Sequence, residues 1–355
     1  SEMCIRDRCW YGNRVWILKN DLLYFSDAYP SDYSTAFDTA SNVYRVPVGE
    51  ERALIPTRDM GIIIFGKQAI WALAPSATPS ASDKPEPIVT SHGCVANKTV
   101  CQVGDDIYYL APDGVRSLIR TIQDKLQAGA SYPLSYVLKE EYDNINWAYI
   151  EKACAVYWNN TYFIALPTGS STYNNQVWVY YPAMQAWTII TGWNVGAWAK
   201  FKVNGEERLY YADATDGKVY RAWYGYDDNG TAINYQEETR QEDLGQPLLY
   251  KAGGEVEVKC QASGDYDVSV YASFDDGGWN LLGTINLSGN LITFPVSFPV
   301  NFYTANVVSE KFHLDSYGRW KLLKLKFQHN ALNGNDDIII LEHSITTYLE
   351  QYQSE

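Results

Sequence analysis

The sequence has little positive charge and no long hydrophobic run. Its 42 Asp and Glu residues outnumber 28 Lys and Arg, which gives a formal net charge of −14 at pH 7. A chain this acidic repels phosphate backbones and anionic lipid headgroups, which argues against nucleic-acid binding through a basic patch. No apolar run approaches the roughly 20 residues that cross a bilayer, so we expect no membrane insertion.

Cysteine and histidine are few, and neither follows a ligand-binding pattern. No CxxC, HExxH, GxSxG, Walker or GxGxxG motif occurs, so the sequence predicts no catalytic, cofactor-binding or metal-binding residue and no cofactor. Cys94 and Cys101 are close enough in sequence to pair, but buried thiols in strands are the favoured interpretation. The five cysteines outside the first eight residues are Cys9, Cys94, Cys101, Cys154 and Cys260.

Four groups of residues are candidate sites, and each has a simpler structural explanation. His92 beside Cys94 suggests a base and a nucleophile, but neighbouring strand residues alternate faces and no third group is identifiable. Glu140, Glu141 and Asp143 form the densest acidic group, on a predicted helix where a solvated face is expected. The other histidines are His313, His329 and His343.

Two further segments are interpreted as turns. Ser273, Asp275, Gly277 and Trp279 are close to the Asp-box of sialidase-type propellers, with one residue too few before the tryptophan, and we predict a hairpin turn there. The acidic turns offer oxygen ligands for calcium without EF-hand spacing, so ordinary turn chemistry is the stronger interpretation. Those turns contain Asp213, Asp216, Asp227, Asp228 and Asn229.

Aromatic residues and turn residues are abundant, and they recur together. Aromatics make up 15% of the chain, with 29 Tyr and 12 Trp beside 25 Gly, a balance that favours strands and turns over helices. Five turns are each followed by an apolar, aromatic strand, at residues 20, 66, 104, 159 and 204. The intervals are 46, 38, 55 and 45 residues, which is the spacing of propeller blades.

The sequence therefore predicts an all-β protein in which a β-propeller of about five or more blades occupies residues 9–235. Ile62, Ile63, Ile64 and Phe65 form the continuous apolar run expected of a strand buried on both faces. A short helical insertion is expected near 115–145, and an exposed inter-blade loop over 74–90. The alternative is a large β-sandwich with accidental turn spacing.

After residue 235 the pattern changes to alternation. Residues 255–259 and 267–271 alternate polar and apolar side chains, which predicts strands with one wet face. Further strands are expected near 291–298, 319–327 and 337–348, with a turn at 333–335. Residues 236–355 are therefore predicted to form a β-sandwich.

The first eight residues, Ser1 to Arg8, resemble the translation of a sequencing adapter, and we interpret residues 1–8 as an artefact. On this interpretation the propeller is truncated at its N-terminus, so further blades are expected before residue 9.

Several runs resemble tail proteins of tailed bacteriophages. They are Arg14, Val15, Trp16; Phe25, Ser26, Asp27; Asp113 to Leu118; and Gln176 to Tyr180. The group includes tail nozzle or tail tubular B proteins and head-to-tail stabilisation proteins. The resemblance implies a non-enzymatic virion structural component of a phage tail or neck, assembled in the host cytoplasm as part of an oligomeric ring around the DNA exit channel. Its implied partners are copies of itself, neighbouring tail or neck proteins, and DNA that passes without sequence-specific binding.

The alternative function is a carbohydrate-binding β-propeller, lectin-like or related to inactive glycosidases. Exposed Tyr and Trp side chains stack on sugars, although in a propeller most of them are expected to pack between blades. Equivalent aromatic and acidic pockets on several blades would favour this alternative over a virion component. An enzyme ranks third.

Overall fold

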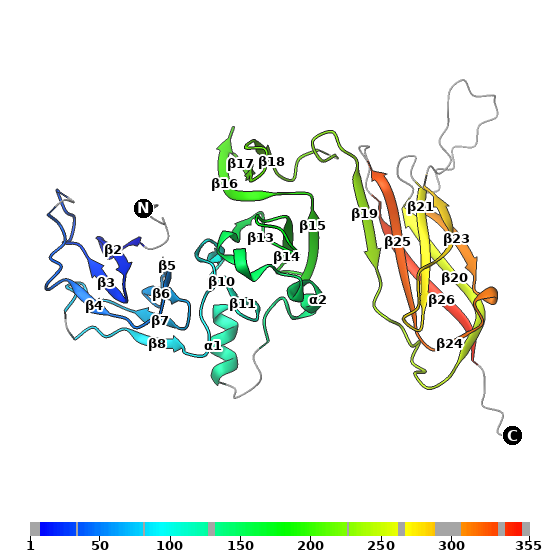
Figure 1. The fold of residues 1–355 in the computed structure, drawn as a ribbon, viewed down its shortest axis with the longest axis horizontal. Coiled ribbons are helices and arrows are strands. Elements are labelled where there is room, and N and C mark those ends of the chain that lie inside the picture. Colours follow the sequence, from blue (N-terminus) through cyan, green and yellow to red (C-terminus); the bar gives the residue numbers. More distant parts are fainter. Residues whose placement is uncertain are drawn as a thin grey trace. The chain divides into compact units, whose positions relative to one another are not determined.

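The computed structural model describes residues 8–32, 35–80, 82–126, 132–225, 227–261, 267–287, 307–332 and 338–349. The chain divides into two compact units, Ser1–Trp223 and Tyr224–Glu355. Strands dominate both units, as Figure 1 shows, and the few helices are short. The predicted all-β class, with propeller blades followed by a β-sandwich, is confirmed.

The described residues of the first unit form five small antiparallel sheets, each a meander of three or four consecutive strands. We number these sheets as blades 1 to 5. Blade 1 contains β1 (Arg8–Tyr11), β2 (Arg14–Lys19), β3 (Leu22–Phe25) and β4 (Val43–Arg45), and blade 2 contains β5 (Glu51–Pro56), β6 (Ile62–Gly66), β7 (Ile70–Leu73) and β8 (Glu86–Val89). Blade 3 contains β9 (Cys101–Val103), β10 (Asp106–Ala111) and β11 (Gly114–Ser117). Blade 4 contains β12 (Cys154–Trp158), β13 (Thr161–Leu166), β14 (Gln176–Tyr181) and β15 (Ala186–Thr191), and blade 5 contains β16 (Val195–Val203), β17 (Glu206–Asp213) and β18 (Val219–Arg221).

The middle strands of blades 2, 3 and 4 each contribute to two hydrophobic cores, one on either face of the blade. In β6, Ile62 and Ile64 pack toward blade 1, while Ile63 and Phe65 pack toward blade 3. In β13, Tyr162 and Ile164 belong to the core shared with blade 3, and Phe163 to the core shared with blade 5. Successive side chains of a strand point to opposite faces, so an uninterrupted apolar run fills both cores.

Four such cores join blade 1 to 2, 2 to 3, 3 to 4, and 4 to 5. Large aromatic side chains lie at their centres, among them Trp16, Tyr109 and Trp178, all fully buried. The blades are therefore held together by face-to-face packing, as propeller blades are.

The five predicted turns are present, but they do not occupy equivalent positions. The turns at Asn20 and Gly66 connect the second and third strands of blades 1 and 2, whereas those at Gly104, Asn159 and Asn204 connect the first and second strands of blades 3 to 5. This shift by one hairpin explains the short interval of 38 residues. The asparagines adopt the positive φ that such tight turns require, for example 52° at Asn20.

Most of the helices of the first unit lie between blades 3 and 4, at the predicted insertion. Residues 115–117 extend β11, and helix α1 (Leu118–Leu126) follows. The hydroxyl oxygen of Ser117 accepts a hydrogen bond from the Arg120 amide at 3.0 Å, which caps the first turn. The remaining short helices are η1 (Asn97–Thr99), η2 (Tyr136–Leu138), α2 (Lys139–Asp143) and η3 (Trp147–Lys152). The predicted loop over 74–90 ends in β8, which pairs with β7.

The second unit is a sandwich of two sheets. One sheet has the order β19 (Ile233–Glu238), β25 (Leu323–Leu332), β21 (Asp267–Phe274), β22 (Asn280–Asn286). In the other, β20 (Lys251–Gln261) pairs with β23 (Val307–His313), β24 (Arg319–Trp320) and β26 (Ile340–Leu349). A short helix, η4 (Asp315–Tyr317), precedes β24. Val256, Val258 and Val270 point into the core between the sheets, which agrees with the predicted alternation.

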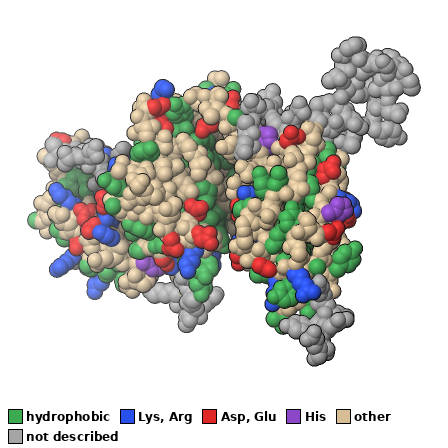
Figure 2. Space-filling view, turned by 45° about the vertical axis from the view of Figure 1, so that its right-hand side comes forward, with side chains coloured by type: hydrophobic (Ala, Val, Ile, Leu, Met, Phe, Trp, Pro, Cys, Tyr) green, Lys and Arg blue, Asp and Glu red, His purple; other side chains and the backbone are tan. Residues whose placement is uncertain are grey.

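Two sequence predictions, the strand near 291–298 and the turn at 333–335, lie outside the described residues. Within the described ranges, no helix has the length and apolar character to span a membrane. On the face drawn in Figure 2, uncharged polar side chains and backbone predominate, and charged side chains are scattered among them.

Candidate functional site

A shallow hollow of about 580 Å³ lies on blade 4, where residues 167–175 connect β13 to β14. We call it the loop hollow. Its volume falls within the range typical of small-molecule sites. Its lining consists of Asn144, Thr168, Gly169, Ser170, Ser171, Thr172, Tyr173 and Asn175. None of these side chains carries a charge at neutral pH.

The connecting loop is held in place by amide side chains. Asn174 is 1% exposed, and its Nδ2 donates to the carbonyl oxygens of Lys152 at 2.9 Å and Val195 at 2.7 Å. Asn175 Oδ1 accepts hydrogen bonds from the amide and the hydroxyl of Thr168, at 2.8 and 3.2 Å. Both lone pairs of that oxygen are occupied, so the orientation of the Asn175 amide is fixed.

The other wall of the hollow comes from the segment between α2 and η3. The Gly169 amide donates to the Asn144 carbonyl at 2.8 Å, and an isolated β-bridge joins Ile145 to Thr168. Asn146 caps η3, because its Oδ1 accepts from the Ala148 amide, and its Nδ2 donates to the Ser171 carbonyl at 2.9 Å. The two walls are therefore rigidly connected.

Several hydrogen-bonding groups of the hollow are available to a ligand. Among the described residues, no partner is found for the side-chain amide of Asn144, the Nδ2 of Asn175, or the hydroxyls of Ser170 and Thr172. Asn144, Ser170 and Thr172 are exposed to solvent, and Tyr173 is half-buried. The arrangement offers neutral donors and acceptors beside one aromatic ring.

Two more exposed aromatic side chains lie on η3, a helix joined to the loop by the hydrogen bonds of Asn146 and Lys152. Trp147 is 37% exposed and Tyr149 is 39% exposed. Trp147 packs edge-on against Tyr142 with ring centroids 5.3 Å apart. Lys152 connects Tyr149 to the hollow, since its Nζ lies 5.1 Å from the Tyr149 ring and donates to the Thr172 carbonyl at 2.6 Å.

His92 and Cys94 do not form a nucleophile and base. Cys94 is fully buried, and its thiol donates to the Ala96 carbonyl at 3.1 Å. His92 Nδ1 lies 2.9 Å from the Ser91 hydroxyl, and its Nε2 is buried with no hydrogen-bond partner in the described part of the chain. The pKa of His92 is lowered by burial and, secondarily, by the charge of Arg116.

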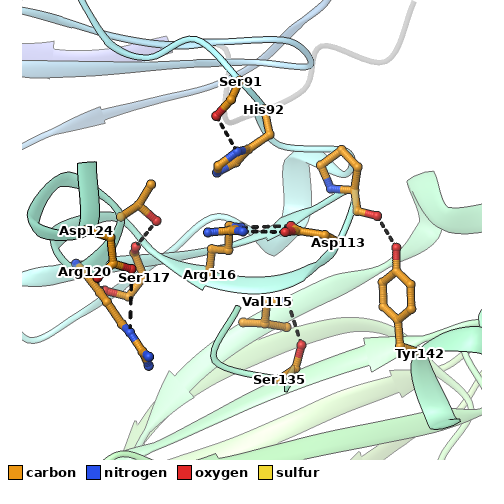
Figure 3. A network of polar contacts seen from close by, with 12 residues as sticks. Ser91, His92, Asp113, Val115, Arg116, Ser117, Arg120, Asp124, Ser135 and Tyr142 are labelled. Atoms are coloured by element: carbon orange, nitrogen blue, oxygen red, sulfur yellow. Dashed lines mark hydrogen bonds and ion pairs between the residues drawn. The ribbon is translucent and has the colours of Figure 1, made fainter. Parts of the chain in front are cut away.

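Figure 3 shows His92 above an ion pair between Arg116 and Asp113. The Arg116 side chain is only 5% exposed, and its Nε donates to Asp113 Oδ1 at 2.8 Å. Burial is the largest single influence on the pKa of Asp113 and raises it, but the hydrogen bond and the charge of Arg116, with a smaller contribution from His92, together lower that pKa below its ordinary value. The pair fixes the β10–β11 hairpin, and neither of its residues lines the loop hollow.

The other residues considered in the sequence lie in separate places. On α2, Glu141 accepts a hydrogen bond from Gln176 Nε2 at 3.1 Å. Asp275 accepts from the backbone amides of Lys321 and Leu322, and the Ser273 hydroxyl donates to the Gly277 carbonyl at 2.7 Å, as a hairpin turn requires. Asp213 likewise caps its own turn. Within the described ranges, no three His, Cys, Asp or Glu residues gather in a group that could hold a metal ion.

The chain is similar to solved structures of carbohydrate-active enzymes. One is a glycoside hydrolase family 43 arabinoxylan arabinofuranohydrolase from Bacillus subtilis, with 11% identity, coverage of 96% of each chain and a TM-score of 0.22. Another is an exo-β-1,3-galactanase from Phanerochaete chrysosporium, with 10% identity, coverage of 95% of this chain and 96% of that one, and a TM-score of 0.24. No protein-family model and no curated protein matches the chain.

These similarities overturn the functional prediction made from the sequence. The predicted phage tail or neck component is wrong, as are the predicted virion location and the prediction that the chain is not an enzyme, since the similar structures are glycoside hydrolases. The runs that carried the phage resemblance are blade-core segments: Trp16 of β2 and Trp178 of β14 are fully buried between blades. Any propeller needs such segments, so they identify a blade and not a family.

Proposed function

We propose that this protein binds neutral carbohydrate, with the loop hollow of blade 4 as the binding site. The observation that carries the proposal is a hollow whose lining has no charged residue and consists of uncharged hydrogen-bonding side chains, one tyrosine and one glycine. A ligand that fits such a lining presents many hydroxyl groups and no net charge.

The hydrogen-bonding pattern of the hollow supports a polyhydroxylated ligand. A sugar hydroxyl both donates and accepts, and it is well matched by an amide group or by another hydroxyl. Asn175 has its oxygen fully used by Thr168, so its Nδ2 presents donors in a fixed direction. Preorganised donors of this kind bind without an additional ordering cost.

Aromatic rings next to the hollow support the same proposal. Tyr173 lines the hollow, and Trp147 and Tyr149 are exposed on the adjoining helix η3. The apolar C–H faces of a sugar ring pack against such rings while its hydroxyls hydrogen-bond to the surrounding amides. The open position of the hollow would admit a stretch of a longer glycan.

Binding is tested by a glycan array, followed by titration calorimetry with the neutral oligosaccharide that binds best. We expect Asn144→Ala to raise Kd about 3- to 10-fold, which corresponds to one hydrogen bond. Tyr173→Ala should raise Kd by a similar or larger factor because it also removes an aromatic contact.

Matched controls separate the site from the rest of the surface. Gln123→Ala removes an exposed amide from α1, and Tyr136→Ala removes an exposed tyrosine from η2, and both should leave Kd unchanged. A protein that binds no neutral glycan, or one whose glycan affinity is unaffected by both hollow variants, would contradict the proposal.

A further inference from the structure

The side-chain amide of Asn175 has a fixed orientation in the loop hollow. Its Oδ1 accepts hydrogen bonds from the backbone amide of Thr168 at 2.8 Å and from the Thr168 hydroxyl at 3.2 Å. A backbone N–H can only donate, so the oxygen and the nitrogen of the Asn175 side chain cannot exchange places. The Nδ2 group lies on the other side of the amide, and the described residues provide no acceptor for its two N–H donors.

A group that only donates distinguishes between the oxygen atoms of a sugar. A hydroxyl can accept from Nδ2, but its own hydrogen then needs a second acceptor nearby. The carbonyl oxygen of an acetamido group has two lone pairs and no hydrogen, so it accepts from a fixed N–H donor and leaves nothing unpaired. Asn175 therefore favours a sugar that carries an acetamido group over one with a hydroxyl at the same carbon.

The remaining atoms of an acetamido group also find partners in the lining. Tyr173 lies two residues before Asn175, lines the same hollow and is half-buried, so its ring offers an apolar surface to the acetamido methyl. The acetamido N–H needs an acceptor, and the hydroxyl oxygens of Ser170 and Thr172 are available for it. Among the described residues, none that lines the hollow is charged, so the ammonium group of a non-acetylated amino sugar finds no carboxylate there.

We propose that the loop hollow binds an N-acetylated amino sugar, whose acetamido oxygen accepts from Asn175 Nδ2 and whose methyl group packs on Tyr173. The inference rests on the proposed function and specifies the class of sugar. The Asn144 amide on the opposite wall remains for the ring hydroxyls, which all sugars have in common. Asn144 therefore contributes to the affinity for any neutral glycan, whereas Asn175 determines which substituent is preferred.

The inference is tested by titration calorimetry of the full chain with pairs of sugars that differ only at C2. The pairs are tri-N-acetylchitotriose and cellotriose, N-acetyllactosamine and lactose, and N-acetylgalactosamine and galactose. In at least one pair, we expect the N-acetylated member to bind about 10-fold more tightly than the hydroxyl member, because it gains a hydrogen bond with no unpaired hydrogen and a methyl contact.

Asn175→Asp tests the direction of the hydrogen bond. The carboxylate still accepts from Thr168, but an oxygen replaces the Nδ2 donor, and this oxygen repels the acetamido oxygen and accepts from a hydroxyl. The preference for the N-acetylated member should therefore disappear or reverse. Asn204→Asp, at an exposed position in the β16–β17 turn, adds the same charge elsewhere and should leave the preference unchanged.

The free-amine counterpart of the preferred N-acetylated sugar provides a test that needs no substitution. Its ammonium group cannot accept a hydrogen bond, so the unsubstituted protein should bind it at least about 10-fold more weakly. This measurement decides the question if the circular dichroism of Asn175→Asp departs from that of the unsubstituted protein.

Equal or tighter binding of the hydroxyl member in every pair, or a preference that survives Asn175→Asp, would overturn the inference. The proposed function is judged separately. If Asn144→Ala weakens the binding of both members of a pair and neither is preferred, the hollow binds glycan without selecting the acetamido group. If no glycan binds, the inference and the proposed function both fail.

Discussion

The two units of this protein bury their strands differently. In β6 of the propeller unit, every residue from Ile62 to Phe65 is fully buried. In β20 of the sandwich, Val256 and Val258 are fully buried, while Glu257 between them is only partly buried and faces outward. A blade between two other blades has two covered faces, whereas a sheet of a two-layer sandwich has one. A continuous apolar run along a strand therefore indicates a sheet covered on both faces, and alternation of polar and apolar side chains indicates a sheet covered on one.

The largest effect should come from truncating consecutive residues in a blade. Ile63→Ala and Ile64→Ala remove side chains from two different cores, and each should lower the free energy of unfolding by about 2–5 kcal/mol. The equivalent pair in the sandwich should respond unequally, with Val258→Ala costing about 1–3 kcal/mol and Glu257→Ala less than about 1. Urea unfolding of the full chain measures all four.

Equal costs for Val258→Ala and Glu257→Ala would contradict the one-sided burial of β20. A negligible cost for either isoleucine variant would show that one face of blade 2 is not covered.

A smaller effect is expected from the buried lysine of the sandwich. Lys251 is fully buried, and its Nζ donates to the carbonyl oxygens of Gln246 at 2.8 Å and Lys321 at 2.7 Å. Burial lowers the pKa of Lys251. Lys251→Met keeps the length of the side chain but leaves these carbonyls unpaired, which should cost about 1–3 kcal/mol. Thermal unfolding of the variant checks this prediction. A Tm equal to that of the unsubstituted protein would mean that water reaches and hydrogen-bonds to these carbonyls.

The propeller unit should also lose stability at mildly acidic pH. Its His92 has a pKa lowered by burial, so the neutral form is favoured in the folded state. The stability from this group is fully present above the unfolded pKa, about 6.5, and is lost as the pH falls below it. The slope should stay below about 1.4 kcal/mol per pH unit, which is the limit for one proton.

The measurement is the free energy of unfolding of the propeller unit between pH 7.5 and 5, compared with that of His92→Gln. The variant should show a shallower dependence in this window. Identical slopes for the two proteins would contradict the assignment to His92.

The smallest effect should come from a surface ion pair of the sandwich. Lys259 Nζ lies 3.0 Å from Glu342 Oε2, and both side chains are exposed to solvent. Lys259→Met should change the free energy of unfolding by less than about 1 kcal/mol, since such pairs are screened and ordered at an entropic cost. The measurement is urea unfolding. A larger loss would show that the solvent-exposed face of β20 contributes more to stability than its exposure suggests.

Much of the fold could be predicted because burial leaves a pattern in the sequence. The run from Ile62 to Phe65 indicated a strand covered on both faces, and the alternation around Val256 indicated the sandwich. The sequence could not show that the repeated turns occupy different positions in their blades. Asn20 and Asn159 have similar local turn chemistry, and only the strand pairing shows that they join different strands of their blades.

The loop hollow was not predicted from the sequence. Residues 167–175 are mostly small or polar, and their sequence is typical of a surface turn. Their arrangement depends on Asn174, which reaches Lys152 and Val195, residues far away in the sequence. Nothing in the local sequence indicates that Asn144 forms the opposite wall.

The proposed glycan site is tested most directly by NMR of protein labelled with ¹⁵N at asparagine, titrated with the best-binding neutral oligosaccharide. The proposal predicts that the side-chain amide signals of Asn144 and Asn175 shift together with increasing ligand, while the Asn280 amide, in the sandwich, stays unchanged. Shifts confined to asparagines outside the loop hollow, or no shift at saturating glycan, would contradict it.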